Sequence, residues 1–186
     1  MRPGLVALLL TWSSLGLAGA PARDAGAALR QAQPAAEELL PLTLPDLSGL
    51  HPSVEKQLRE AHASISKKLE GAGGSPDTHA EAFGEMGKLF MATRFNDEAE
   101  RSFRNAERLG PNDFRWPYYL GHVLRNAGDL PGAAESFERV RQLRPTDFAT
   151  LVWLGRVYLD LSRPAEAEAR LNEARVLNPR QPAARV

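Results

Sequence analysis

The residues best suited to acid–base or metal chemistry in this sequence are its four histidines, and they are scattered along the chain. They are His51, His62, His79 and His122. A zinc site needs its ligands at short helical spacing or in one cluster, and no two of these histidines share a helix face at such a spacing. We therefore expect no metal site, and we expect His122 to be a polar residue at the edge of a binding surface.

The sequence also lacks the residues that usually carry nucleophilic catalysis and phosphate binding. The sequence contains no cysteine, which excludes disulfides, thiolate ligands and a cysteine nucleophile. It has no G-x-S-x-G motif, and the glycines of residues 71–76 neither follow a strand nor precede a lysine and a hydroxyl residue. The sequence therefore predicts no catalytic residue, no cofactor and no enzyme activity.

Composition narrows the class of partner. Of the 186 residues, 43% are hydrophobic and 25% are charged, which is close to the globular average. Lys and Arg together number 23, as do Asp and Glu, so the formal net charge is zero. A protein that binds a phosphate backbone needs an excess of basic side chains, and we therefore expect no nucleic-acid partner.

The N-terminus has the three-part pattern of a secretory signal. In residues 1–22, Arg2 precedes an apolar run centred on Leu5–Leu10, and small residues follow. The run is much shorter than the ~20 residues that span a bilayer, so no membrane span is expected in the mature chain. Cleavage would follow Ala20 or Ala22. We expect an exported protein, periplasmic or secreted, and the Ala-, Arg-, Leu- and Pro-rich composition favours a bacterial source.

Two segments lead into the rest of the chain. Residues 23–50 form an Ala/Pro/Leu-rich leader whose later leucines are too apolar for a free linker, so we expect them to pack on the following domain. The alternative is a peptide that docks a partner. Residues 51–71 predict one amphipathic helix that ends in glycines. Its apolar stripe has spacings of three and four. The stripe consists of Val54, Leu58, Ala61, Ile65 and Leu69.

From residue 80 onward the sequence repeats itself in three gapless units of 34 residues, 80–113, 114–147 and 148–181. Small residues recur in phase where helix backbones must approach, and bulky residues recur beside them. The phased small residues and prolines are Gly87, Gly121 and Gly155, then Ala99, Ala133 and Ala167, then Pro111, Pro145 and Pro179. Each unit predicts two helices. Their ranges are 78–92 and 96–109, 113–127 and 131–143, and 147–160 and 164–177.

Proline and aspartate mark the predicted helix starts. Pro131 and Pro164 open second helices, where a missing N–H costs nothing. Asp113 and Asp147 are expected to cap first helices. Pro117 lies inside a predicted helix but in its first turn, where N–H groups have no intrahelical partner, so the helix should not be broken.

This pattern resembles the tetratricopeptide repeat, and the match covers residues 80–181. The resemblance implies an all-α fold, a right-handed superhelical α-solenoid of helix-turn-helix repeats, preceded here by the amphipathic helix. Residues 182–186 would begin a truncated fourth repeat. The second helix of the last unit is not a convincing cap, so its open end either continues into a longer polypeptide or binds another chain, including a second copy.

The resemblance also implies a concave groove lined mainly by the first helix of each unit. Transferred by alignment, the expected partner-binding residues are Lys88, Arg115, Tyr118, Tyr119, His122, Arg125, Asn126, Val152, Trp153 and Arg156. Aromatic residues and arginine are enriched at binding hot spots. Some family members hold a peptide's terminal carboxylate with a Lys/Asn/Arg clamp, and that clamp is essentially absent from this sequence.

These features predict a non-catalytic protein–protein interaction scaffold in the cell envelope, which binds a segment of a protein or peptide partner in the groove. The alternative is the N-terminal repeat portion of a longer exported enzyme or cofactor-bearing protein. The identity of the partner depends on a few side chains that follow no shared code.

Overall fold

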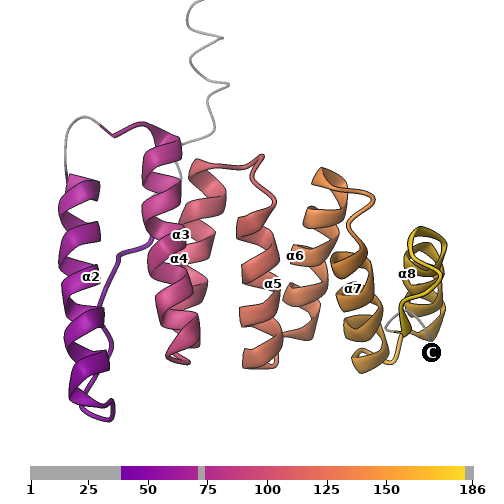
Figure 1. Cartoon of the computed structure of the whole chain (residues 1–186), viewed down its shortest axis with the longest axis horizontal. Helices are drawn as coiled ribbons and strands as arrows, with labels where there is room; N and C mark the ends of the chain where they lie inside the picture. The colour runs from indigo at the N-terminus through magenta and orange to yellow at the C-terminus, as the bar shows by residue number, and fades with distance from the viewer. Residues whose placement is uncertain (1–38, 71–73, 183–186) are drawn as a thin grey trace, which may run out of the picture. The chain divides into compact units, whose positions relative to one another are not determined.

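The structure is a computed structural model that describes residues 39–70 and 74–182, and this part of the chain is helical without any strand. Its helices are α2 (Pro52–Glu70), α3 (Pro76–Ala92), α4 (Asn96–Leu109), α5 (Arg115–Ala127), α6 (Leu130–Leu143), α7 (Phe148–Asp160) and α8 (Pro164–Leu177). Each helix packs against the next one along the chain (Figure 1). The predicted all-α repeat solenoid is confirmed. The predicted signal peptide and the first part of the leader lie outside the described residues.

The helix ends agree with the repeat pattern to within two residues. Asp147 caps α7 as predicted, since its carboxylate accepts the Thr150 N–H at 2.8 Å. The prediction for Asp113 needs a correction, because α5 begins at Arg115 and its N-cap is Phe114. Asp113 still accepts the Arg115 N–H at 3.0 Å, but its carboxylate is also paired with the Arg115 guanidinium, which draws it out of the usual capping position.

Pro117 is buried in the first turn of α5, and the helix continues unbroken past it to Ala127, as predicted. The preceding residue, Trp116, is 1% exposed and lies over Gly84 of α3. A Cβ at Gly84 would approach Cζ3 of the indole to 2.1 Å. The first helices of units one and two therefore meet through a tryptophan ring seated on a glycine.

Within each unit, the aligned glycine of the first helix likewise makes room for a bulky side chain of the second helix. Gly87, Gly121 and Gly155 face Phe103, Phe137 and Leu171 of the second helices, and an added Cβ would come within 2.9 Å of each side chain. The predicted close approach of the two helices in each unit is therefore present. None of the described helices is long and apolar enough to cross a membrane.

Residues 39–50, which we call the N-terminal strap, run as a largely extended segment into α2. The strap is joined to α4 by Asn105, a side chain only 1% exposed: the Leu40 N–H donates to its Oδ1 at 2.8 Å, and its Nδ2 donates to the Leu40 carbonyl at 2.7 Å. His62 Nε2 of α2 lies 3.2 Å from the Leu42 carbonyl. Leu47 is buried in the main core. The leucine-rich part of the leader thus packs on the domain.

Candidate partner-binding surface

Six of the ten residues predicted to bind a partner are brought together by α5 and α7, the first helices of units two and three. Tyr118, Tyr119, His122 and Arg125 come from α5, and Trp153 and Arg156 come from α7. We call these six residues the aromatic–arginine surface. They meet because helical spacing on α5 places its four residues on neighbouring turns, and α7 follows α5 as the next first helix.

The rings of this surface form a continuous row. Tyr118 contacts Tyr119 and His122 edge-on, with ring centroids 6.0 and 4.7 Å apart. His122 in turn meets Trp153 edge-on at 4.8 Å, which joins the two helices. Edge-to-face contacts of this kind favour one relative orientation of the rings. The row is therefore preorganised before any partner binds.

A second layer of rings supports the row from the second helices. Phe103 of α4 stacks on Tyr119 with centroids 5.3 Å apart and an interplanar angle of 16°. Phe137 of α6 lies 5.1 Å from the His122 ring and 6.0 Å from the Tyr118 ring. The sequence did not lead us to expect either phenylalanine at the surface. Their positions opposite the phased glycines Gly87 and Gly121 are the signal that could have placed them under it.

Two arginines flank the indole at the end of the row. The guanidinium carbons of Arg125 and Arg156 lie 5.1 and 5.0 Å from the Trp153 ring centroid. Arg125 Nε is 3.8 Å from Asp160 Oδ2, which is too long for a hydrogen bond, and this buried Nε has no hydrogen-bond partner within the described part of the chain. Arg156 is exposed, so its guanidinium is the donor group most accessible to a carboxylate of a partner.

Two ring side chains of the surface, Tyr118 and His122, are neutral at pH 7. Burial lowers the pKa of His122 to about 4, and the Arg125 cation acts in the same direction. Burial also raises the pKa of Tyr118, and the nearby Asp147 carboxylate adds to this effect. The positive charge of the surface therefore comes from its two arginines.

We expect His122 to titrate near pH 4, which can be measured by NMR from the pH dependence of its ring resonances. In the unfolded chain a histidine binds its proton near pH 6.5. Protons consequently favour the unfolded chain, and the contribution of His122 to stability is lost as the pH falls from about 6.5 towards 4. The variant His122→Gln assigns the signal and should show a weaker pH dependence of stability in this window. A midpoint above pH 6 would contradict the buried, neutral imidazole.

Three other predicted residues lie apart from the surface. Arg115 is held by Glu81 and Asp113, with its Nη2 2.7 and 2.6 Å from their carboxylate oxygens. Lys88 pairs with Glu85 one turn earlier on α3. Asn126 is exposed near the end of α5. Within the described residues none of the three forms a ring contact or ion pair with the six residues of the surface.

The prediction is corrected at Val152, which is only 5% exposed. Its side chain belongs to a small apolar cluster with Leu151 of α7 and Ala174 of α8. The alignment places Val152 at the repeat position of Tyr118 and Gly84, but these three side chains have different neighbours. A position in the repeat therefore does not by itself decide exposure.

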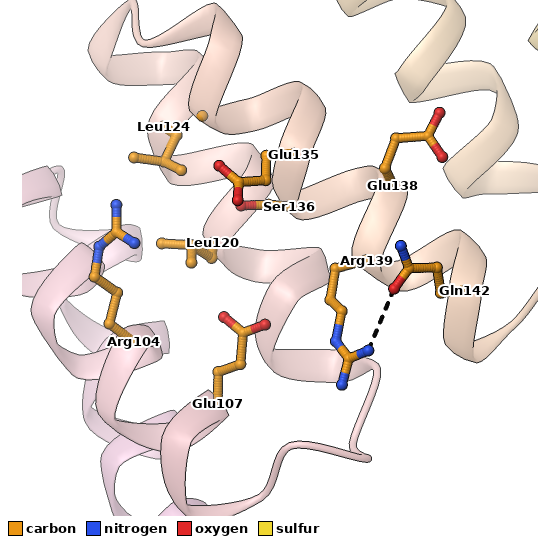
Figure 2. Close-up of a pocket in the computed structure, with 10 residues that line it drawn as sticks. Arg104, Glu107, Leu120, Leu124, Glu135, Ser136, Glu138, Arg139 and Gln142 are labelled. Carbon is orange, nitrogen blue, oxygen red and sulfur yellow. Dashed lines mark hydrogen bonds between the residues drawn. The ribbon is translucent and has the colours of Figure 1, made fainter. Parts of the chain in front are cut away.

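A cavity of about 340 Å³ lies on another side of the repeats, between α4, α5 and α6. Figure 2 shows Arg104, Glu107, Glu135 and Arg139 arranged around Leu120. Arg139 donates to Gln142 Oε1 at 3.3 Å and to the Pro111 carbonyl at 2.8 Å. Burial raises the pKa of Glu107. The arginines that line the cavity already have partners within the protein. Because the cavity walls carry charges of both signs, the cavity selects no single class of ligand.

Comparisons with known proteins place this geometry in a family. Two family models described as tetratricopeptide repeat match residues 85–148 and 124–185. Among solved structures, "MamA MSR-1 C2" has a TM-score of 0.59 at 19% identity and covers 69% of this chain and 70% of that one. YrrB, described as "a TPR protein with an unusual peptide-binding site", has a TM-score of 0.58 at 21% identity, covering 71% and 66%.

A third similar structure is the first repeat domain of Spaghetti (RPAP3) bound to an HSP90 peptide, with a TM-score of 0.55 at 16% identity over 58% of this chain and 86% of that one. A comparison with curated proteins finds no match. At these identities the structural likenesses establish the fold.

Proposed function

Because the chain belongs to the tetratricopeptide repeat (TPR) family, in which protein–protein interaction is the general role, we propose that it binds a segment of a partner protein on the aromatic–arginine surface. The observation that carries this proposal is the preorganised row of Tyr118, His122 and Trp153, which ends between two arginines. Such a surface is a binding scaffold and needs no catalytic group.

The chemistry of the surface suits a segment that presents both apolar and acidic side chains. The tyrosines offer area for apolar or ring contacts at little cost in side-chain entropy. The guanidinium groups of Arg125 and Arg156 suit a carboxylate, and both lie within about 5 Å of the Trp153 ring, which favours a fixed position for each cation. Two structurally similar proteins described as peptide-binding, YrrB and the RPAP3 domain, support a peptide segment as the ligand.

We also propose that the mature protein acts in the cell envelope or outside the cell. The support is the signal-like pattern of residues 1–22, with Arg2 before a short apolar run and small residues. A partner would therefore be sought among envelope or secreted proteins.

The proposal is tested by affinity capture from an envelope extract, followed by titration of the purified partner. We expect the double variant Tyr119→Ala/Arg156→Ala to weaken binding at least about tenfold, because each substitution removes a residue of a type enriched at binding hot spots. The matched control is Arg101→Ala/Arg104→Ala, which removes two exposed side chains of α4 outside the surface. Equal binding by the wild type and the Tyr119/Arg156 variant would place the partner elsewhere.

A further inference from the structure

We propose that two copies of this chain pair through the outer face of α8, with the two helices antiparallel and a two-fold axis at Asn172. This interface is separate from the aromatic–arginine surface on α5 and α7. It follows from the side chains of α8, from an internal comparison of the three repeats, and from the covered opposite end of the described helices.

The outer face of α8 is exposed and largely uncharged at its centre. Its residues recur at helical spacing, and they are Ala165, Glu168, Ala169, Asn172, Arg175 and Val176. The opposite side of the helix holds the buried Ala167, Leu171 and Ala174. Val176 is 77% exposed, which is unusual for a valine in a helix that has a well-packed inner side.

The other two repeats show that these positions accept charged and polar residues, also where the following unit packs nearby, since Glu138 of α6 accepts the Tyr158 hydroxyl at 3.0 Å. At the positions of Ala169, Asn172 and Val176, the helix α4 has three arginines and the helix α6 has two glutamates and a glutamine. These residues are Arg101, Arg104 and Arg108 in α4, and Glu135, Glu138 and Gln142 in α6. The repeat fold therefore does not require small or apolar residues here. Their presence in α8 alone indicates that its outer face makes an apolar contact, unlike the charged and polar faces of α4 and α6.

A depression beside Val176 strengthens this difference. It has a volume of about 440 Å³ and an almost wholly apolar lining that includes Pro145, Leu151 and Leu177. One unit earlier, Arg139 reaches over the corresponding place and donates to the Pro111 carbonyl at 2.8 Å. In α8 that position is Glu173, which pairs with Arg170 at 2.6 Å and leaves the depression open.

The charges on the outer face of α8 favour a second copy of the chain as the partner, and they favour an antiparallel arrangement of the two helices. A two-fold axis at Asn172 places Glu168 of one copy near Arg175 of the other, since the two residues lie at nearly equal distances on either side of the axis. By the same geometry Ala169 lies opposite Val176, so that a small side chain meets a larger one. A parallel pair would instead bring Glu168 to Glu168 and Arg175 to Arg175, which is repulsive.

The arrangement also limits assembly to two copies. At the opposite end of the described helices, α2 and the N-terminal strap cover α3 and α4, and Leu47, Leu58 and Ile65 are buried there. A head-to-tail stack therefore has no matching apolar face to accept α8. A face that pairs with itself gives a closed dimer.

The test is sedimentation of the full chain over a range of concentrations. We expect a dimer for the wild type. Glu168→Arg and Arg175→Glu should each weaken dimerisation at least about tenfold, because each sets like charges against each other twice. An equimolar mixture of the two variants should form a mixed dimer, since opposite charges then face each other again. Arg101→Glu is the matched control, with a charge reversal on the exposed face of α4.

A cross-link checks the position of the axis. The chain has no cysteine, so Asn172→Cys introduces a single thiol, and mild oxidation should produce a covalent dimer. Arg104→Cys, at the same repeat position in α4, should not. Circular dichroism of each variant verifies the fold. A wild-type monomer, a dimer that tolerates Glu168→Arg, or a series of larger oligomers would each overturn the proposal.

Discussion

Gly84→Ala is expected to lower the free energy of unfolding by about 2–3 kcal/mol, although alanine is normally the better helix residue by about 1 kcal/mol. The added Cβ would lie 2.1 Å from Cζ3 and 2.3 Å from Cη2 of Trp116. The indole is buried and cannot swing away, so α3 and α5 must separate or Trp116 must leave its rotamer. Urea denaturation measures the loss directly.

A second substitution shows whether the indole is the cause. Trp116→Leu removes the atoms that clash, so Gly84→Ala should cost at least about 1 kcal/mol less in that background than in the wild type. Gly49→Ala is the control, because no atom lies within 4 Å of its added Cβ. Additive losses in the double variant would contradict the proposed clash.

Asn105→Leu is expected to release the N-terminal strap and to destabilise the fold by about 3 kcal/mol. The substitution removes both hydrogen bonds to Leu40 and leaves its N–H and carbonyl without their partners. Hydrogen exchange at Leu40 and proteolytic cleavage within residues 39–50 should both become faster. Protection equal to that of the wild type would show that the apolar contacts alone hold the strap.

A nearly isosteric variant distinguishes the contributions of the two hydrogen bonds to stability. In Asn105→Asp the carboxylate can still accept from the Leu40 N–H, but only the protonated acid can donate to the Leu40 carbonyl. The stability of this variant relative to the wild type should therefore be better near pH 4 than at pH 7. The opposite trend would mean that the donor of Asn105 contributes little.

Much of the fold could be predicted because the repeat pattern depends on contacts between neighbouring segments. The phased glycines and alanines mark where helices approach, and the leucines of the leader indicate packing on the domain. The bond between Leu40 and Asn105 could not be predicted in this way. Asn105 stands where the other units have Arg139 and Glu173, and its burial depends on a segment 65 residues away.

In the candidate surface too, some features could be predicted from the sequence and others could not. The alignment selects side chains that point in one direction, and the structure brings Tyr118, His122 and Trp153 into contact. The same alignment includes Val152, whose exposure is decided by packing against α8. It also gives no indication that Trp116 would cover Gly84, because that contact joins two different units.

The bond between the strap and α4 has a consequence for the order in which a newly made chain can fold. Helix pairs of the repeats can form as soon as each unit is complete, whereas Leu40 is synthesised 65 residues before Asn105. At 5–20 residues per second this interval is roughly 3–13 s. During that time the strap can contact α2 but not α4, so the Leu40 backbone groups stay without their partner until the second helix of the first unit has been made.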